Sequence, residues 1–138
     1  MKASLIDRSN YYRGMLVLIG RDRIVHPDER KLAVELGRLL DFDKRFCEAA
    51  IADLLENVHI NEDPIFFEER KIAECYLRDG LKVSLIDNEL DAREMGWLDT
   101  VARVNRLPEG WVQKEYEKIS PGGPKASTPA DYEIRKYL

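Results

Sequence analysis

Apolar residues recur along most of the chain at the three- and four-residue spacing of an α-helix. The clearest stripe begins at Tyr12 and ends at Ile19, and helix geometry places its members on one face. Five further stripes follow, in the regions 32–40, 46–58, 72–86, 97–104 and 109–118. Strict alternation of apolar and polar residues over four or more positions is nearly absent, so strands are not expected. The pattern predicts an all-α protein.

Helix-start signals agree with these stripes. Pro27 suits the first position of a helix, where its missing N–H costs nothing. Asp43 is placed to cap the third stripe, and the Asp63–Pro64 pair is expected to open the fourth. Asp91 and Glu94 have the spacing of a capping box. Short connectors lie between the stripes, which is typical of a single-domain helical bundle.

The end of the chain has a different composition. Residues 120–127 are rich in Pro, Gly and Ser and contain no apolar anchor. We therefore expect residues 1–120 to form the helical domain. Residues 121–138 are expected to form a mobile loop and a short terminal helix of the same domain, with the helix beginning near Thr128.

The chain contains a faint internal repeat at an offset of 65 residues. At that offset Val25 falls on Leu90 and Leu36 falls on Val101. Each copy consists of a helix end, an aspartate, a tight turn, an apolar residue and a helix with a glutamate in its first turn. The four acidic residues that recur in this way are Asp22, Glu29, Asp87 and Glu94. A duplicated helical unit with a pseudo-two-fold relation between its halves explains the pattern.

This arrangement of acidic turns resembles the tellurite-resistance TerB-like family, over roughly residues 11–117. The connectors at residues 41–43 and 107–111 are similar to those of the family. The resemblance implies an all-helical domain of about seven helices with an acidic site. It also implies a role in tellurite or general stress responses, often in membrane-associated or metal-sensing complexes. No enzymatic activity follows from it.

The four acids have two interpretations. Carboxylates gathered by two neighbouring turns suit Ca²⁺ or Mg²⁺, which prefer oxygen ligands. Alternatively, the glutamates cap their helices and the aspartates order their own turns. The family tends to have glycine after the aspartate of the turn, whereas here Arg23 follows Asp22 and Asn88 follows Asp87. Arg21 and Arg23 also place a positive charge on either side of Asp22. Because two cations flank Asp22, Asp87 and Glu94 are the stronger metal candidates.

Composition limits the function classes. Of 138 residues, 44% are hydrophobic and 35% are charged, and the net charge is −4. Binding to nucleic-acid backbone is therefore not expected. No apolar run approaches the length of a transmembrane helix, so a cytoplasmic protein is the default. The two cysteines, Cys47 and Cys75, are expected to be buried free thiols.

The sequence analysis favours a non-enzymatic TerB-like domain that binds a protein partner and, through its acidic turns, a divalent cation. A peripheral membrane complex and a homo-oligomer remain open. No catalytic motif is present in the sequence, so no catalytic residue is assigned. One alternative is a metal-dependent hydrolase that uses the same carboxylates. Another is a helix-turn-helix nucleic-acid binder, but the second and third predicted helices lack its basic residues.

Overall fold

The computed structural model describes residues 2–19, 27–56, 64–85, 90, 92–119 and 132–138. These residues form six α-helices and one short 3₁₀-helix, and no strand occurs among them. The elements are α1 (Leu5–Ile19), α2 (Pro27–Leu39), α3 (Lys44–Glu56), α4 (Arg70–Ser84), α5 (Ala92–Val104), α6 (Trp111–Ile119) and η2 (Glu133–Tyr137). The all-α prediction is confirmed. The described α-helices number six, where the sequence predicted about seven.

The helix bounds repeat at the offset seen in the sequence. Shifting α1 by 65 residues gives the first and last residues of α4, and the same shift converts α2 into α5. The third helices differ, because α3 has 13 residues and α6 has nine. Two consecutive helices of each half therefore share one register.

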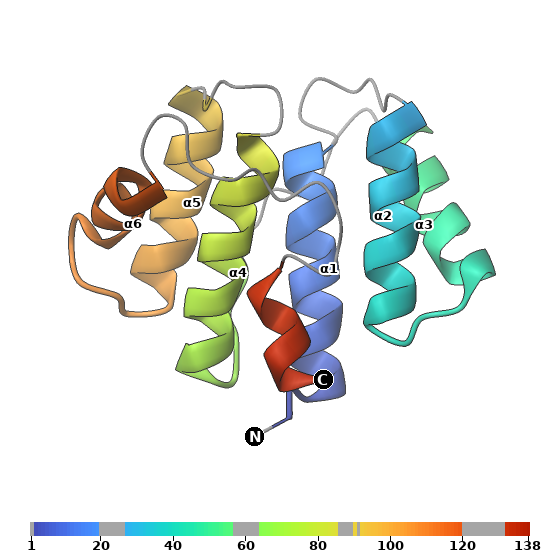
Figure 1. Ribbon diagram of the computed structural model, residues 1–138, viewed down its shortest axis with the longest axis horizontal. Coiled ribbons are helices and arrows are strands. Elements are labelled where there is room, and N and C mark those ends of the chain that lie inside the picture. Colours follow the sequence, from blue (N-terminus) through green and yellow to red (C-terminus); the bar gives the residue numbers. More distant parts are fainter. Residues whose placement is uncertain (1, 20–26, 57–63, 86–89, 91, 120–131) are drawn as a thin grey trace.

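Figure 1 shows how the two sets of helices are arranged. Helices α1 and α4 lie at the centre and contact each other. Helices α2 and α3 lie on one side of this pair, and α5 and α6 lie on the other. Helix α1 also packs against α2, α2 against α3, α4 against α5, and α5 against α6. Neighbour relations in the first half thus recur in the second.

A reciprocal contact joins the two central helices. Tyr11 and Tyr76, which are related by the 65-residue offset, are both fully buried, and their rings meet edge to face with centroids 5.8 Å apart. The Tyr11 hydroxyl donates a hydrogen bond to Asp79 at 2.8 Å. The Tyr76 ring covers Gly14, the residue that the offset relates to Asp79. Each tyrosine therefore contacts the equivalent position of the opposite helix.

Helices α2 and α5 end with the same cap. Asp41 and Arg106 follow these helices with φ angles of 70° and 62°, in the left-handed region that glycine usually occupies. The Phe42 amide donates to the Gly37 carbonyl at 2.8 Å, and the Leu107 amide makes the equivalent bond at 3.0 Å. These six-to-one bonds define a Schellman motif at both sites. The repeat therefore extends to the backbone conformation of the turns.

Two predicted helix starts are confirmed and a third is corrected. Pro27 is the first residue of α2, and the Phe46 amide donates to the Asp43 carboxylate at 2.8 Å, which caps α3. Helix α4 begins at Arg70, later than the predicted start at Asp63–Pro64. The reason is that residues 64–69, before α4, are not helical and bury the side chain of Phe67 in the core.

The end of the chain is docked where it is described. Residues 132–138, named here the C-terminal segment, contain η2 and pack on α4. Tyr132 and Ile134 belong to the main core, and the Ala3 amide donates to the Tyr137 carbonyl at 2.7 Å. The predicted mobile stretch and the predicted helix start at Thr128 lie outside the described residues. The part that is described is fixed to the core by its apolar side chains.

Helix length and composition bear on the membrane alternatives. Among the helices described, none combines the length and the apolar character that crossing a membrane requires. Both cysteines are free and buried, as predicted.

Candidate functional site

The predicted acidic site is described in part. Glu29 and Glu94 occupy the third position of α2 and α5, are partly buried, and each has an interaction partner. Asp22 and Asp87 lie outside the described residues. The third helical position is where a capping-box glutamate belongs, so both glutamates stand at equivalent sites of the two halves.

The helices that flank the two predicted acidic turns meet at one end of the bundle. Helices α1 and α4 end there, and α2 and α5 begin there (Figure 1). Within the described ranges, no group of three or more His, Cys, Asp or Glu side chains could hold a metal ion. Glu29 and Glu94 alone therefore do not make a metal centre.

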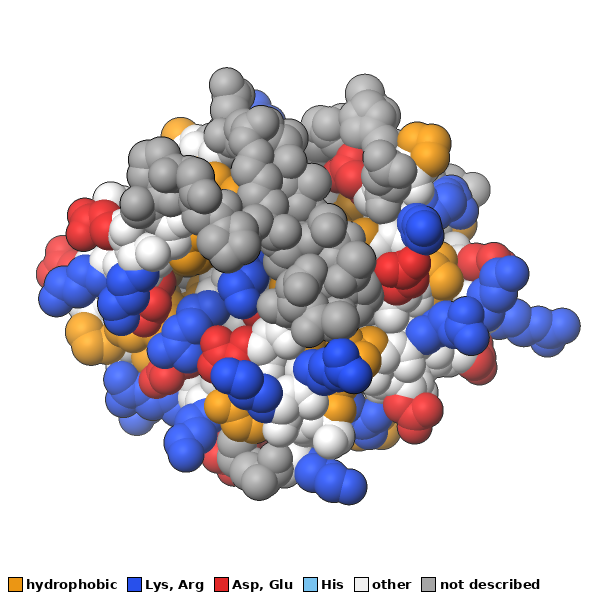
Figure 2. All heavy atoms as spheres, viewed as in Figure 1, with side chains coloured by type: hydrophobic (Ala, Val, Ile, Leu, Met, Phe, Trp, Pro, Cys, Tyr) orange, Lys and Arg blue, Asp and Glu red, His pale blue; other side chains and the backbone are white. Residues whose placement is uncertain are grey.

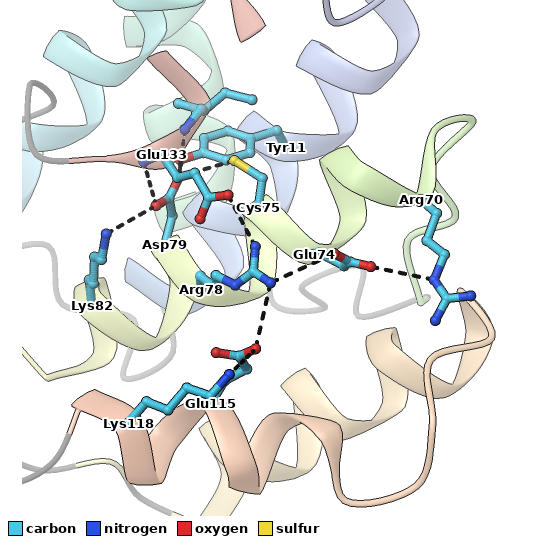
Figure 3. Close-up of polar contacts among 11 residues, drawn as sticks. Tyr11, Arg70, Glu74, Cys75, Arg78, Asp79, Lys82, Glu115, Lys118 and Glu133 are labelled. Carbon is cyan, nitrogen blue, oxygen red and sulfur yellow. Dashed lines mark hydrogen bonds and ion pairs between the residues drawn. The ribbon is translucent and has the colours of Figure 1, made fainter. Parts of the chain in front are cut away.

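A second polar site, which the sequence analysis did not identify, lies on α4. Its centre is the fully buried carboxylate of Asp79 (Figure 3). This carboxylate accepts hydrogen bonds from the Tyr11 hydroxyl at 2.8 Å and from the Cys75 thiol at 3.5 Å. It also accepts the backbone amides of Glu133 at 2.8 Å and Ile134 at 3.1 Å. Asp79 thus fixes the start of η2.

Burial controls the ionisation of this site. Removal from water raises the pKa of Asp79 above its ordinary value of 3.8, while the Glu133 amide, the Tyr11 hydroxyl and Lys82 act in the opposite direction. The Lys82 Nζ atom lies 3.8 Å from the carboxylate. Burial and the nearby Asp79 also raise the pKa of the Cys75 thiol. This thiol stays protonated and serves as a hydrogen-bond donor.

Arg78, the neighbour of Asp79 in sequence, forms ion pairs with three carboxylates (Figure 3). Its guanidinium lies 3.0 Å from Glu133 of η2, 3.5 Å from Glu115 of α6 and 3.7 Å from Glu74 of α4. The same group stacks over the Trp111 ring at 5.3 Å from the ring centroid. A planar, always charged guanidinium suits this shared role. Arg78 therefore joins α4, α6 and the C-terminal segment.

The surface around this network carries both signs of charge. Figure 2 shows the face on which η2 lies. Lys and Arg side chains stand next to Asp and Glu side chains there, and apolar side chains appear only in small separate areas. Nothing on the visible part of this face has the single-sign charge of a nucleic-acid surface.

An equivalent anchor lies on α1. The Asp7 carboxylate is fully buried and accepts the backbone amides of Glu68 at 2.8 Å and Glu69 at 3.1 Å. These amides belong to the non-helical segment that leads into α4, so Asp7 fixes the start of that helix. The Asn10 side chain supports the same segment by donating to the Phe66 carbonyl at 3.1 Å.

The two anchors hold their segments in the same way. In each, one carboxylate accepts two consecutive amides, at residues 68–69 for Asp7 and at residues 133–134 for Asp79, with one oxygen to each amide. The two amide pairs are related by the 65-residue offset. The aspartates are 72 residues apart in the chain, so the C-terminal segment binds about two helical turns further along its helix.

Two sequence signals could have revealed these anchors. Asp79 lies on the apolar face of its helix, seven residues after Ile72, where a charge needs buried partners. In addition, residues 64–71 (PIFFEERK) align with residues 129–136 (PADYEIRK) at the same offset as the helices. They share a proline, an aromatic residue followed by glutamate, and an Arg-Lys pair. The repeat therefore reaches into the C-terminal segment.

Comparison with known proteins identifies no relative. No protein-family model matches the chain, and neither a curated protein nor a solved structure matches it. The resemblance to the TerB-like family therefore stays a prediction that depends on the motifs of the acidic turns.

Proposed function

We propose that the chain is a non-enzymatic TerB-like helical domain of a tellurite- or stress-response system. In this proposal it binds a protein partner through the acidic turns that follow α1 and α4, and a divalent cation, Ca²⁺ or Mg²⁺, joins the carboxylates of those turns. The observation that carries the proposal is that the helices flanking both turns begin and end together at one end of a duplicated bundle.

The repeated register supports the proposal of an internal pseudo-two-fold relation. The bounds of the first two helices of each half, the C-caps of α2 and α5, and the reciprocal tyrosine contacts recur at one offset. A pseudo-two-fold axis between α1 and α4 would bring the turns that contain Asp22 and Asp87 close to each other. Hard oxygen ligands from two turns are the donor set that Ca²⁺ and Mg²⁺ prefer.

The chemistry of the buried acids supports a non-enzymatic role. The carboxylates of Asp7 and Asp79 each accept hydrogen bonds from backbone amides, so both side chains have a structural role. Cys75 donates to Asp79 and is kept protonated by burial, which removes the thiolate that nucleophilic catalysis needs.

Titration with Ca²⁺ and with Mg²⁺, followed through backbone amide chemical shifts, tests cation binding. We expect saturable shifts in the first turn of α5 with a dissociation constant of about 10⁻⁴–10⁻³ M, as in loosely built calcium sites. Asp87→Asn should weaken binding more than the matched change Asp22→Asn, because Arg21 and Arg23 repel a cation at Asp22. No shift at millimolar cation would disprove the cation site and leave the acids as capping groups.

Growth of the parent organism on tellurite tests the physiological part. Deletion of the gene should increase tellurite sensitivity, and the intact gene should restore growth. A gene with Asp87→Asn and Glu94→Gln should restore it poorly if the acidic turns carry the function. Unchanged growth of the deletion strain on tellurite would contradict the tellurite role.

A further inference from the structure

The C-terminal segment is bound as a ligand would be, through a site that other helices build. We define the α4 docking site as Tyr11, Cys75, Arg78 and Asp79. It recognises two kinds of group in the segment: consecutive backbone amides, which Asp79 accepts, and the Glu133 carboxylate, which Arg78 binds at 3.0 Å. Charge-assisted hydrogen bonds of this type are stronger and more directional than neutral ones.

Most of the docking site is held in place by groups outside the C-terminal segment. Arg78 is positioned by Glu74 on its own helix, by Glu115 of α6 and by the ring of Trp111. Asp79 is positioned by Tyr11 of α1, Cys75 and Lys82. The site is therefore preorganised, which lowers the entropic cost of binding a peptide.

The molecule uses this docking mode twice, which gives independent support for a recognition site. Asp7 holds residues 68–69 as Asp79 holds residues 133–134, and both segments contain an aromatic residue followed by glutamate. The first segment continues directly into α4, so it cannot leave without unfolding that helix. The second leads only into the five-residue η2, so its release would not require any of the six described α-helices to unfold.

From these observations we propose that the α4 docking site binds a peptide segment of a partner protein in place of the chain's own C-terminal segment. The partner segment carries the pattern aromatic–Glu–aliphatic and adopts the conformation of residues 132–134, in which an extended aromatic residue leads into a 3₁₀ turn. The aromatic and aliphatic side chains replace buried Tyr132 and Ile134, and the glutamate replaces Glu133 at Arg78. This inference concerns a surface separate from the acidic turns and does not rest on the proposed function.

The chain's own segment is the competitor. A segment tethered to its site binds as an intramolecular ligand, which competes with any free peptide for that site. A free peptide therefore binds the wild-type chain weakly. Any change that loosens the tethered segment without altering the docking site raises the apparent affinity for the free peptide.

Binding of a fluorescent peptide with the sequence of residues 128–138 to the full-length chain tests the proposal. Ile134→Ala in the chain loosens its own segment, and we expect the wild-type peptide to bind at least tenfold more tightly to this variant than to the wild-type chain. Adding Asp79→Asn to the variant should abolish that gain, whereas the matched surface change Asp99→Asn should preserve it. A peptide with Glu133→Ala and Ile134→Asp should not bind.

Glu133→Ala provides a second loosened chain, because it removes only the ion pair of a partly exposed side chain and keeps the core intact. It should also bind the peptide more tightly than wild type. Helical circular dichroism establishes which variants are folded. Folded loosened variants that bind no better than wild type, or a gain that survives Asp79→Asn, would overturn the proposal. Dimers of the wild-type chain that free peptide dissociates would assign the site to a second copy and also overturn it.

Discussion

Helices α1 and α4 hold equivalent places at the centre of the bundle, yet their polar residues differ. Both have 15 residues, and both carry a buried tyrosine at the same register position. Three residues after this tyrosine, α1 has Gly14 and α4 has Asp79. Glycine there admits the ring of Tyr76, whereas aspartate there accepts the hydroxyl of Tyr11 and anchors the C-terminal segment.

This difference separates what the duplicated fold requires from what one half has added. The first two helices of each half share register and length, and α2 and α5 share a C-cap, because each is needed to close the same core. At the 65-residue offset, Arg78 corresponds to Arg13, which has the same charge. Asp79 and Lys82 correspond to uncharged residues of α1. Residues that break the repeat are therefore the place to search for a specific role.

Gly14→Ala tests the close approach of the central helices and should have the largest effect. A methyl group at Gly14 would lie 2.5 Å from Cζ of Tyr76. The ring cannot easily retreat, because it is fully buried and its hydroxyl accepts a hydrogen bond from Trp97 at 3.0 Å. We expect the free energy of unfolding in urea to fall by about 3 kcal/mol, at the upper end of the usual cost of overpacking.

Gly96→Ala is the matched control for this change. Gly96 lies in α5, is exposed, and has no neighbouring atom within 4 Å of an added methyl group. Alanine there should stabilise the protein by up to about 1 kcal/mol through helix propensity. Equal stability of the Gly14 and Gly96 variants would show that α1 and α4 do not approach as closely as the reciprocal contacts require.

The repeating elements of the fold could be predicted from the sequence because they depend on local pattern. Helical spacing identified the six α-helices, and the 65-residue offset relates the bounds of α1 to those of α4 and the bounds of α2 to those of α5. Pro27 and Asp43 marked helix starts correctly, since a first-turn proline and a capping aspartate act within one helical turn.

The anchors could not be predicted in the same way because they are long-range. Asp79 acts on amides 54 and 55 residues away, and Asp7 on amides 61 and 62 residues away. Periodicity cannot pair such positions. The late start of α4 has the same cause: residues 64–69 are held outside the helix by partners elsewhere in the chain, which overrides the local signal of Asp63–Pro64.

The pH dependence of stability distinguishes Asp79 from an ordinary surface acid. Burial raises the pKa of Asp79 in the folded protein above 3.8. Its protonated form is therefore favoured by folding, and the associated stability is fully present below the unfolded pKa and is lost as the pH rises through the folded pKa. We expect this loss to be on the order of 1 kcal/mol for each unit by which the pKa is raised.

Urea unfolding at a series of pH values above 3.8 measures this contribution. Asparagine at position 79 cannot titrate. The stability of the wild type relative to Asp79→Asn should therefore fall as the pH rises. Asp99→Asn, at an exposed site of α5, should leave the wild-type dependence intact. A constant difference between wild type and Asp79→Asn across the series would contradict a raised pKa.

The smallest expected effect compares the two C-caps. Asp41 and Arg106 both have positive φ, but aspartate tolerates the left-handed conformation better than arginine does. Arg106→Gly should therefore stabilise the protein by about 1 kcal/mol, and Asp41→Gly by about half as much, since glycine removes the steric cost of its side chain. Arg103→Gly, an exposed position within α5, should instead cost about 1 kcal/mol. Thermal and urea unfolding of the three variants measure these differences. Destabilisation by Arg106→Gly would contradict the left-handed cap that the two halves share.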